Sequence, residues 1–212
     1  MTNKPNKHLY MKRPGATCEW YTPTNIVDRV IATLGHIDLD PCSNKLESIP
    51  ACRHFTKKDD GLNQEWAGKV YMNPPWGKAL RLWAAKLVSD VRSGRVTEAI
   101  SLTPAQNINR QWFNRFLVGQ VQVFVTGSVK FWNSKTDDNN PGWPLPIMIQ
   151  YFGPNPEKFI EHFKNLGIIV QRVNLAAEVA ASGRKQSTVN RPDQAVGGVC
   201  SSGRTRRQVK AA

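Results

Sequence analysis

The sequence contains little cysteine, few acidic residues and no long hydrophobic run. Four of its 212 residues are cysteines, and none of them forms a C-x-x-C pair, which argues against a disulfide scaffold and a paired-cysteine motif. No apolar stretch approaches the roughly 18 residues of a membrane-spanning helix, and the first residues lack the apolar segment of a secretory signal. We therefore expect a cytoplasmic protein that is not embedded in a membrane.

Signatures of metal binding and of nucleophilic catalysis are also missing. The four histidines are not spaced as metal ligands, and neither a Ser-His-Asp arrangement nor a Gly-x-Ser-x-Gly segment is present. Cys42, Cys52 and His54 form the one grouping that resembles a partial metal cluster. We do not predict a metal site from it.

Acidic residues are outnumbered by basic ones, and the excess lies at the ends of the chain. The protein carries 29 Lys+Arg against 16 Asp+Glu, a net charge of +13. Residues 1–18 contribute +4 and residues 183–212 contribute +6, which leaves +3 for residues 19–182. Basic ends on a weakly basic core favour a polyanionic partner, most often nucleic acid, although they can also serve solubility alone.

The composition divides the chain into a folded part and two polar ends. We predict a basic, flexible arm over 1–18, a folded domain over 19–175 and a basic, disordered tail over 176–212, because Gly, Ser, Arg and Gln dominate the tail. Apolar periodicity predicts helices over 24–34, 78–91, 109–118 and 156–166, and strands over 36–40, 69–72, 98–102, 121–125, 147–152 and 168–173. This alternation predicts an α/β fold with a mostly parallel sheet covered by helices.

The most informative segment, Asn73-Pro74-Pro75-Trp76, directly follows the predicted strand 69–72. Ligands of open α/β sheets bind just beyond the carboxyl ends of the strands. Because proline lacks an N–H group, this corner presents carbonyl oxygens, and those of the Asn73 side chain and Pro74 could accept both hydrogens of an –NH2 group. Trp76 could stack on the ring that carries this amine. Taken alone, the segment is also compatible with a simple turn.

Acidic residues occur at other predicted strand ends upstream of this corner. Asp38 and Asp40 close the strand 36–40, and Asp59 and Asp60 lie about a dozen residues before Asn73. We expect these side chains at the same edge of the sheet, where carboxylates can hold the amine and hydroxyl groups of a nucleoside cofactor. Any single one of them is better explained as a helix cap or a solvated turn, but several on one edge favour a ligand.

The ordered series EWYTP, DLDPCSN, DDGL, VYMNPPWG and GSVKF resembles the phage-type DNA N6-adenine methyltransferases of the Dam family, over roughly residues 19–153. The resemblance implies a Rossmann-like, class I methyltransferase fold, S-adenosylmethionine as the methyl donor and adenine in DNA as the substrate. A phage or prophage origin, and a use in restriction-modification, follow from this resemblance alone.

The resemblance also implies roles for individual residues. It places the catalytic tetrapeptide on Asn73, Pro74, Pro75 and Trp76. The implied cofactor-binding residues are Trp20, Tyr21, Thr22, Pro23, Asp38, Asp40, Pro41, Cys42, Asp59, Asp60 and Asn73. Asp60 or its neighbour Asp59 falls where an acid accepts from the amine of the cofactor adenine. The sequence departs from the family in lacking a glycine-rich first loop, and Glu47 is a weak candidate for the acid that holds the ribose.

Polar residues beyond the corner form a predicted DNA-binding face, represented by Gln106, Asn109, Arg110 and Lys130. Asn and Gln can read adenine edges and Arg can read guanine, whereas a plain helix surface explains each residue individually. The expected mechanism flips the adenine out of the duplex and transfers the methyl group directly to its amine, without a metal or a covalent enzyme intermediate. Two alternatives stay open: methylation of another amine (cytosine-N4, RNA adenine or protein glutamine), and an inactive nucleic-acid-binding relative.

Overall fold

The computed structural model describes residues 20–117, 121–132 and 142–171. The predicted arm over 1–18 and the tail over 176–212 lie outside these residues. Seven strands form one sheet in the order β2-β1-β3-β4-β6-β5-β7. They are β1 (Ile37–Asp40), β2 (Ala51–His54), β3 (Gly68–Met72), β4 (Val96–Pro104), β5 (Val121–Val125), β6 (Ile147–Phe152) and β7 (Gly167–Gln171).

The direction of the strands brings most of their carboxyl ends to one side. β2, β1, β3 and β4 are parallel to their neighbours, whereas β6 is antiparallel to both β4 and β5, and β7 is antiparallel to β5. β1 to β5 therefore run in one direction, and β6 and β7 run in the other, which agrees with the predicted mostly parallel sheet. We call the side where β1 to β5 end, and where β6 and β7 begin, the carboxyl edge.

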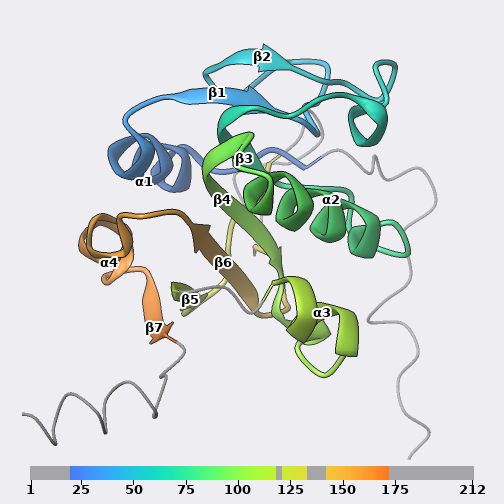
Figure 1. Cartoon of the computed structure of the whole chain (residues 1–212). Helices are drawn as coiled ribbons and strands as arrows, with labels where there is room; N and C mark the ends of the chain where they lie inside the picture. The colour runs from blue at the N-terminus through green and yellow to red at the C-terminus, as the bar shows by residue number, and fades with distance from the viewer. Residues whose placement is uncertain (1–19, 118–120, 133–141, 172–212) are drawn as a thin grey trace, which may run out of the picture. The chain divides into compact units, whose positions relative to one another are not determined.

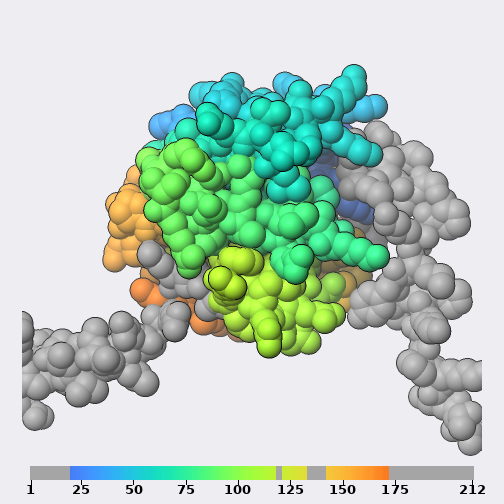
Figure 2. Space-filling view, turned by 45° about the vertical axis from the view of Figure 1, so that its right-hand side comes forward, coloured from blue at the N-terminus to red at the C-terminus, as the bar shows by residue number. Residues whose placement is uncertain are grey.

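Helices cover both faces of this sheet (Figure 1). They are α1 (Thr24–Leu34), α2 (Leu80–Arg92), α3 (Gln111–Phe116) and α4 (Pro156–Phe163), with short 3-10 helices η2 (Gly61–Asn63) and η3 (Ala105–Asn107). One hydrophobic cluster packs α1 and α4 against the sheet, for example through Val30 and Phe159. A second cluster packs α2 and α3 on the other face, for example through Leu87 and Phe113. Figure 2 shows α2 and α3 side by side on one side of the molecule.

Local sequence explains why α1 forms where the periodicity predicts it. Its buried side chains include Ile26, Val30 and Leu34, whose spacing places them on one helical face. The helix ends at Gly35, which has a φ of 83° and donates its backbone N–H to the Ile31 carbonyl oxygen at 2.6 Å. Glycine adopts this left-handed conformation without the steric cost of a Cβ atom. α1 therefore starts and stops at fixed points, and the residues just before it are held in place.

The connection between β1 and β2 is the part of the fold that the sequence does not predict. β2 was not expected, because it is a four-residue strand at the edge of the sheet with two exposed residues, Cys52 and Arg53. Residues 41–50 cross from β1 to β2 without a helix, although parallel strands are usually joined by one. Glu47 in this crossover has a left-handed φ of 47°.

Candidate active site

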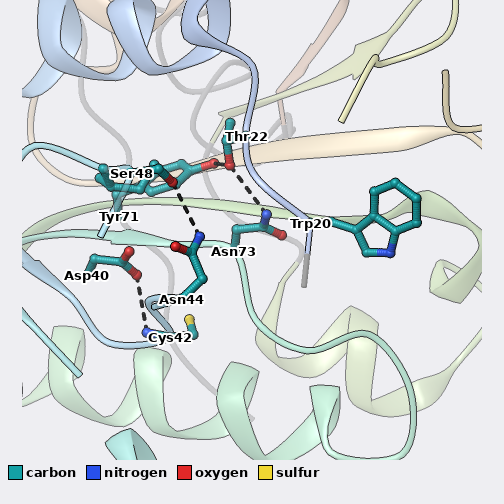
Figure 3. Close-up of a pocket in the computed structure, with 9 residues that line it drawn as sticks. Trp20, Thr22, Asp40, Cys42, Asn44, Ser48, Tyr71 and Asn73 are labelled. Atoms are coloured by element: carbon teal, nitrogen blue, oxygen red, sulfur yellow. Dashed lines mark hydrogen bonds between the residues drawn. The ribbon is translucent and has the colours of Figure 1, made fainter. Parts of the chain in front are cut away.

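A small cleft lies at the carboxyl edge (Figure 3). Its lining residues come from the segment before α1, the end of β1 with the crossover that follows, and the end of β3. They are Trp20, Thr22, Asp40, Cys42, Asn44, Ser48, Ile49, Tyr71 and Asn73. Five of them, Trp20, Thr22, Asp40, Cys42 and Asn73, are predicted cofactor-binding residues, so the fold brings these distant parts of the sequence together.

The side chain of Asn73 is tied to the segment before α1. Its Nδ2 donates to Thr22 Oγ1 at 3.3 Å, and Thr22 Oγ1 lies 2.9 Å from the hydroxyl oxygen of Tyr71. Thr22 and Tyr71 are buried, and Asn73 is partly buried. As a result, the carbonyl oxygen of the Asn73 side chain points away from Thr22, on the side of the view where the Trp20 indole lies (Figure 3).

Asp40 is a buried carboxyl group at the end of β1. Its residue is 4% exposed, and this burial raises the pKa of Asp40 to about 6, although hydrogen bonds from the Cys42 N–H and the Ser43 hydroxyl act in the opposite direction. Within the residues that the structure describes, Asp40 takes part in no salt bridge. The nearby His54 also lowers the pKa of Asp40, by less than the hydrogen bonds do. A buried carboxylate that forms no salt bridge suits a positively charged ligand in the cleft.

Cys42 closes the same corner of the cleft. Burial and the neighbouring Asp40 carboxyl raise the pKa of its thiol, while a hydrogen bond from the Asn73 backbone lowers it by less. The thiol is therefore neutral at physiological pH and is not a reactive thiolate. It contributes a soft, uncharged surface beside Asp40 and Asn73.

Aromatic side chains gather around the predicted stacking residue Trp76. The Trp76 ring meets Phe131 edge-on at a centroid distance of 5.3 Å and Trp143 at 4.9 Å, and Trp143 also meets Trp20 at 6.1 Å. Among the described residues, the buried indole N–H groups of Trp76 and Trp143 have no hydrogen-bond acceptor. Phe131 and Trp143 were not predicted as site residues, although Phe131 ends the GSVKF segment of the family resemblance.

Backbone pairing fixes the segments that carry these aromatic residues. Tyr21 N–H donates to the Trp132 carbonyl at 2.8 Å, the Tyr21 carbonyl accepts from Trp132 N–H at 3.3 Å, and the two rings lie 4.3 Å apart. Trp143 N–H donates to the Val129 carbonyl at 2.7 Å. The segments after β5 and before β6 are thereby attached to the strand-like residues ahead of α1. Residues 133–141, between Trp132 and Trp143, lie outside the described residues.

Four predicted prolines shape the site without lining the cleft. Pro23 begins α1, and its carbonyl accepts from the N–H groups of Ile26 and Val27. The two prolines of the tetrapeptide differ, because Pro74 is buried and Pro75 is exposed. Pro41 is also buried, and its carbonyl oxygen would lie 2.0 Å from a Cβ placed on Gly61. Gly61 therefore allows the DDGL segment to pack directly against the end of β1.

Asp59 and Asp60 are exposed and lie beside this contact, not in the cleft itself. Asp59 accepts from the backbone N–H of Thr56 at 2.8 Å and from its hydroxyl at 2.7 Å, and these bonds lower the pKa of Asp59. Asp60 has a left-handed φ of 50° and accepts from Asn63 Nδ2 at 2.7 Å. Both carboxylates thus stabilise their own turn, next to the loop that leaves β1.

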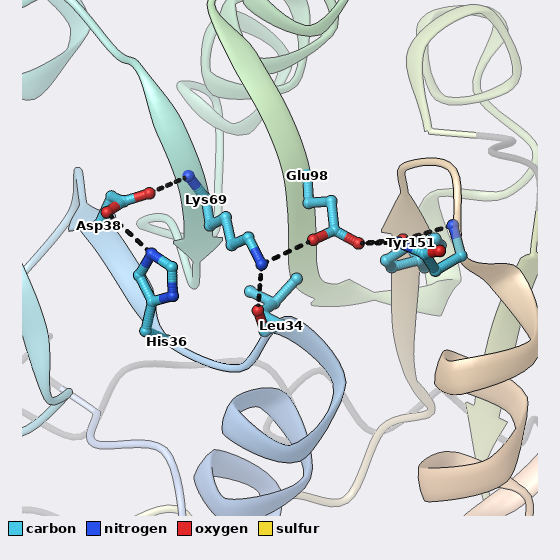
Figure 4. A network of polar contacts seen from close by, with 7 residues as sticks. Leu34, His36, Asp38, Lys69, Glu98 and Tyr151 are labelled. Atoms are coloured by element: carbon cyan, nitrogen blue, oxygen red, sulfur yellow. Dashed lines mark hydrogen bonds and ion pairs between the residues drawn. The ribbon is translucent and has the colours of Figure 1, made fainter.

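The structure places Asp38 away from the cleft, in a polar network near the start of β3 and β4 (Figure 4). Asp38 Oδ2 accepts from the Lys69 backbone N–H at 2.7 Å, beside a bulge at Gly68 where a Cβ would lie 2.3 Å from the same oxygen. Lys69 Nζ pairs with Glu98 Oε2 at 3.1 Å, and Tyr151 donates its hydroxyl hydrogen to Glu98 Oε1 at 2.5 Å. These contacts join neighbouring strands and give no support to the predicted cofactor role of Asp38.

The predicted DNA-binding residues are exposed and share the carboxyl edge with the cleft. Gln106 lies in η3 directly after β4, and Asn109 and Arg110 precede α3. Lys130 follows β5 and lies between the buried residues Val129 and Phe131. All four side chains are therefore available to a partner that approaches this edge.

Two searches of the described residues gave negative results. None of the helices found there is long and apolar enough to cross a membrane. Likewise, no group of three or more His, Cys, Asp and Glu side chains in the described ranges could hold a metal ion.

A polar cleft at the carboxyl edge of a helix-covered sheet, bordered by an Asn-Pro-Pro-Trp corner, is the arrangement of a Rossmann-like methyltransferase. The family model for DNA N-6-adenine-methyltransferase (Dam) matches residues 14–178. The chain therefore belongs to the Dam family of DNA N-6-adenine-methyltransferases. This match confirms the predicted family, the α/β fold class and the transfer of a methyl group to adenine N6 in DNA. A search of curated proteins found no match.

Glu98 allows a test of the network that fixes the central strands. Replacing Glu98 with Ala should lower the free energy of unfolding by about 3 kcal/mol, because Lys69 and Tyr151 lose a buried partner. Urea denaturation of the variant measures this loss. Glu161→Ala, at an exposed position of α4, is the matched control and should change stability by less than about 0.5 kcal/mol. Equal effects of the two substitutions would contradict the assignment.

Asp40 should make the ligand-free protein less stable as the pH rises. Its folded-state pKa of about 6 exceeds the ordinary value of 3.8, so the folded protein binds this proton more tightly than the unfolded chain does. The free energy of unfolding should therefore fall by up to about 3 kcal/mol between pH 4 and pH 7 through this group. Asp40→Asn should remove that part of the decline.

Urea denaturation at several pH values compares Asp40→Asn with the parent protein and with Asp28→Asn, an exposed control on α1. We expect the parent and the control to share one pH profile, and Asp40→Asn to be more stable than both above pH 6. A pH profile that is unchanged in Asp40→Asn would show that Asp40 titrates normally.

Proposed function

We propose that the methyl donor is S-adenosylmethionine bound in the cleft, and that the corner from Asn73 to Trp76 holds the target adenine. The observation that carries this proposal is that the partly buried Asn73 side chain, whose amide is held at Thr22, and the buried Asp40 carboxyl line one cleft. When bound, the donor supplies an electrophilic methyl group on a positively charged sulfur. The donor carries positive charge and Asp40 has no salt-bridge partner among the described residues, so the cleft and the ligand are complementary in charge.

The corner solves a chemical problem of the substrate. The exocyclic amine of adenine is a poor nucleophile because its lone pair is delocalised into the ring. Carbonyl oxygens of the Asn73 side chain and of Pro74 accept its two hydrogens, which orients the amine and favours a localised lone pair. Trp76 stacks on the adenine ring, which must leave the duplex because its amine is otherwise buried in the base pair.

Residues around the corner hold the donor. Asp40 faces its positive charge, and the segment Trp20 to Pro23 contacts its methionine end together with Pro41 and Cys42 from the other side. Asp59 or Asp60 accepts from its adenine amine, next to the Gly61 contact. Asn44 and Ser48, which line the cleft from the helix-free crossover, supply polar groups where the sequence lacks a glycine-rich loop.

DNA approaches the carboxyl edge, where Gln106, Asn109 and Arg110 face the bases and Lys130 faces the phosphates. The basic ends of the chain, 1–18 and 176–212, flank the methyltransferase domain over 19–175 and add sequence-independent attraction to phosphate. We place the enzyme in the cytoplasm of a bacterial host, where it modifies DNA in a phage or restriction-modification setting.

Replacing Asn73 with Ala tests the catalytic corner. The variant should lose at least about 100-fold in the rate of methyl transfer, since one of two acceptors for the amine is gone, and should still bind S-adenosylmethionine in calorimetry. The assay transfers a labelled methyl group to unmodified DNA, RNA and protein, followed by nucleoside analysis. Asn165→Ala, an exposed residue in the turn before β7, is the control. A parent-like rate in Asn73→Ala, or label only in RNA or protein, would refute the proposal.

Arg110 and Lys130 test the DNA-binding face. The double substitution to Ala should weaken DNA binding and reduce the slope of log K against log salt by about 1, because Lys130 is the phosphate contact of the pair and each such contact contributes about 0.9 to the slope. Binding titrations between 50 and 300 mM salt, which are about the working limits for such proteins, measure this slope. The control is the pair Arg92→Ala and Lys158→Ala, exposed at the opposite edge. The same slope in both double variants would place the DNA elsewhere.

A further inference from the structure

The role proposed for Asn73 depends on which end of its amide faces the substrate. The side chain carries an acceptor oxygen and a donor –NH2 group at nearly equivalent positions, and a half-turn about the last side-chain bond exchanges them. Only the oxygen can accept a hydrogen from the adenine amine, because an Asn73 –NH2 group in that place would set two hydrogen-bond donors against each other. Something in the site therefore has to hold the amide in the productive orientation.

Two hydroxyl groups lie where they can do this. Thr22 Oγ1 receives the Asn73 Nδ2 donor at 3.3 Å, and the Tyr71 hydroxyl lies 2.9 Å from the same Thr22 oxygen. Tyr71 lies in β3 and Asn73 directly follows this strand, two residues later, which is the spacing of side chains that share one face of a strand. Thr22 approaches that face from the segment before α1. Three side chains from two distant segments thus form one chain of hydrogen bonds.

Burial makes this chain of hydrogen bonds costly to break. Thr22 is 4% exposed and Tyr71 is 1% exposed, within the cluster that packs α1 and α4 on the sheet. Burial also raises the pKa of the Tyr71 phenol, so it keeps its proton at every working pH. Either hydroxyl could donate between Thr22 and Tyr71, and the arrangement that fixes the amide is the one in which Thr22 donates to the Tyr71 oxygen. In this arrangement, an amide turned the other way would have to take the hydrogen of Thr22 away from the pair, and a buried hydroxyl without a partner costs free energy.

We propose that Thr22 and Tyr71 are positioning residues, whose linked hydroxyl groups hold the Asn73 amide with its –NH2 inward and its carbonyl oxygen toward the adenine amine. This inference rests on the proposed function of Asn73. It assigns the buried Tyr71 hydroxyl, which would not be needed for packing alone, to the methyl-transfer step. It also gives Thr22 a role in addition to its contact with the donor.

The cleanest test is Tyr71→Phe, which removes one hydroxyl and keeps the ring. At saturating donor and DNA, its single-turnover rate of methyl transfer should fall about three- to tenfold, as expected for the loss of one hydrogen bond, while its donor Kd changes less than twofold. Tyr151→Phe is the matched control, because this buried tyrosine donates to Glu98 in the other network. The control should lose stability and keep the parent rate. A parent-like rate in Tyr71→Phe would overturn the proposal.

Thr22 variants add a second, independent measure. Thr22→Ser keeps the hydroxyl and should retain a rate within about threefold of the parent, whereas Thr22→Val keeps the shape and should lose about tenfold or more at saturating donor. Equal rates for Ser and Val would overturn the proposal, because packing alone would then explain the residue. A loss confined to donor Kd in Thr22→Val would also overturn it, since it would leave only the contact with the donor.

A double-mutant comparison separates this inference from the proposed function. In Asn73→Asp the two carboxylate oxygens are equivalent, so orientation no longer matters, and adding Tyr71→Phe should change the rate less than twofold. An equal loss in both backgrounds would overturn the positioning role. If Asn73→Asp is inactive, the rates of the Ser and Val variants of Thr22 decide whether the positioning role holds. A parent-like rate in Asn73→Ala would refute the proposed function itself, whereas a slow Asn73→Ala with a normal Tyr71→Phe would refute only this inference.

Discussion

Parallel pairing of β1 with β3, and of β3 with β4, is the constraint on which the site depends. Leu39 lies opposite Val70, and Tyr71 lies opposite Ile100, so the strands end side by side. Asp40 and Asn73, far apart in the sequence, consequently face one cleft. The network around Lys69 and Glu98 joins the same strands near their other ends, where it can hold the register without occupying the site.

Buried carboxyl groups at the two ends of the sheet differ in their hydrogen-bond partners and in their pKa values. Near the start of β3 and β4, the buried Glu98 is fully engaged, because Lys69, Tyr151 and Asn155 all donate to it. These hydrogen bonds lower its pKa in spite of the burial that opposes ionisation. At the carboxyl edge, burial raises the pKa of Asp40 instead. Polar groups left without protein partners weaken the ligand-free fold, and binding sites commonly retain such groups because a ligand satisfies them.

The sequence identifies the parts of the site that follow directly from strand ends. Asn73 could be predicted because an apolar strand precedes a rigid Pro-Pro corner, and Asp40 because it closes a buried strand. Phe131 and Trp143 could not be predicted, since they reach Trp76 only through the position of β6 between β4 and β5. Asp38 has the same local pattern as Asp40. It lies two residues earlier in β1, farther from the carboxyl edge, and its contact with the backbone beside the bulge at Gly68 is one that no periodicity reveals.

The helix-free crossover between β1 and β2 is consistent with the ligand proposed for the cleft. In dinucleotide-binding folds, the helix after the first strand directs its N-terminus at phosphate groups, and a glycine-rich loop lets the backbone approach them. S-adenosylmethionine carries no phosphate, and the charge nearest its reactive methyl group is positive. A helix N-terminus would repel that charge, whereas the buried Asp40 carboxylate attracts it. The short segment 41–50 in place of helix and glycines is therefore compatible with the donor that we propose, and it places the side chains of Asn44 and Ser48 at the cleft.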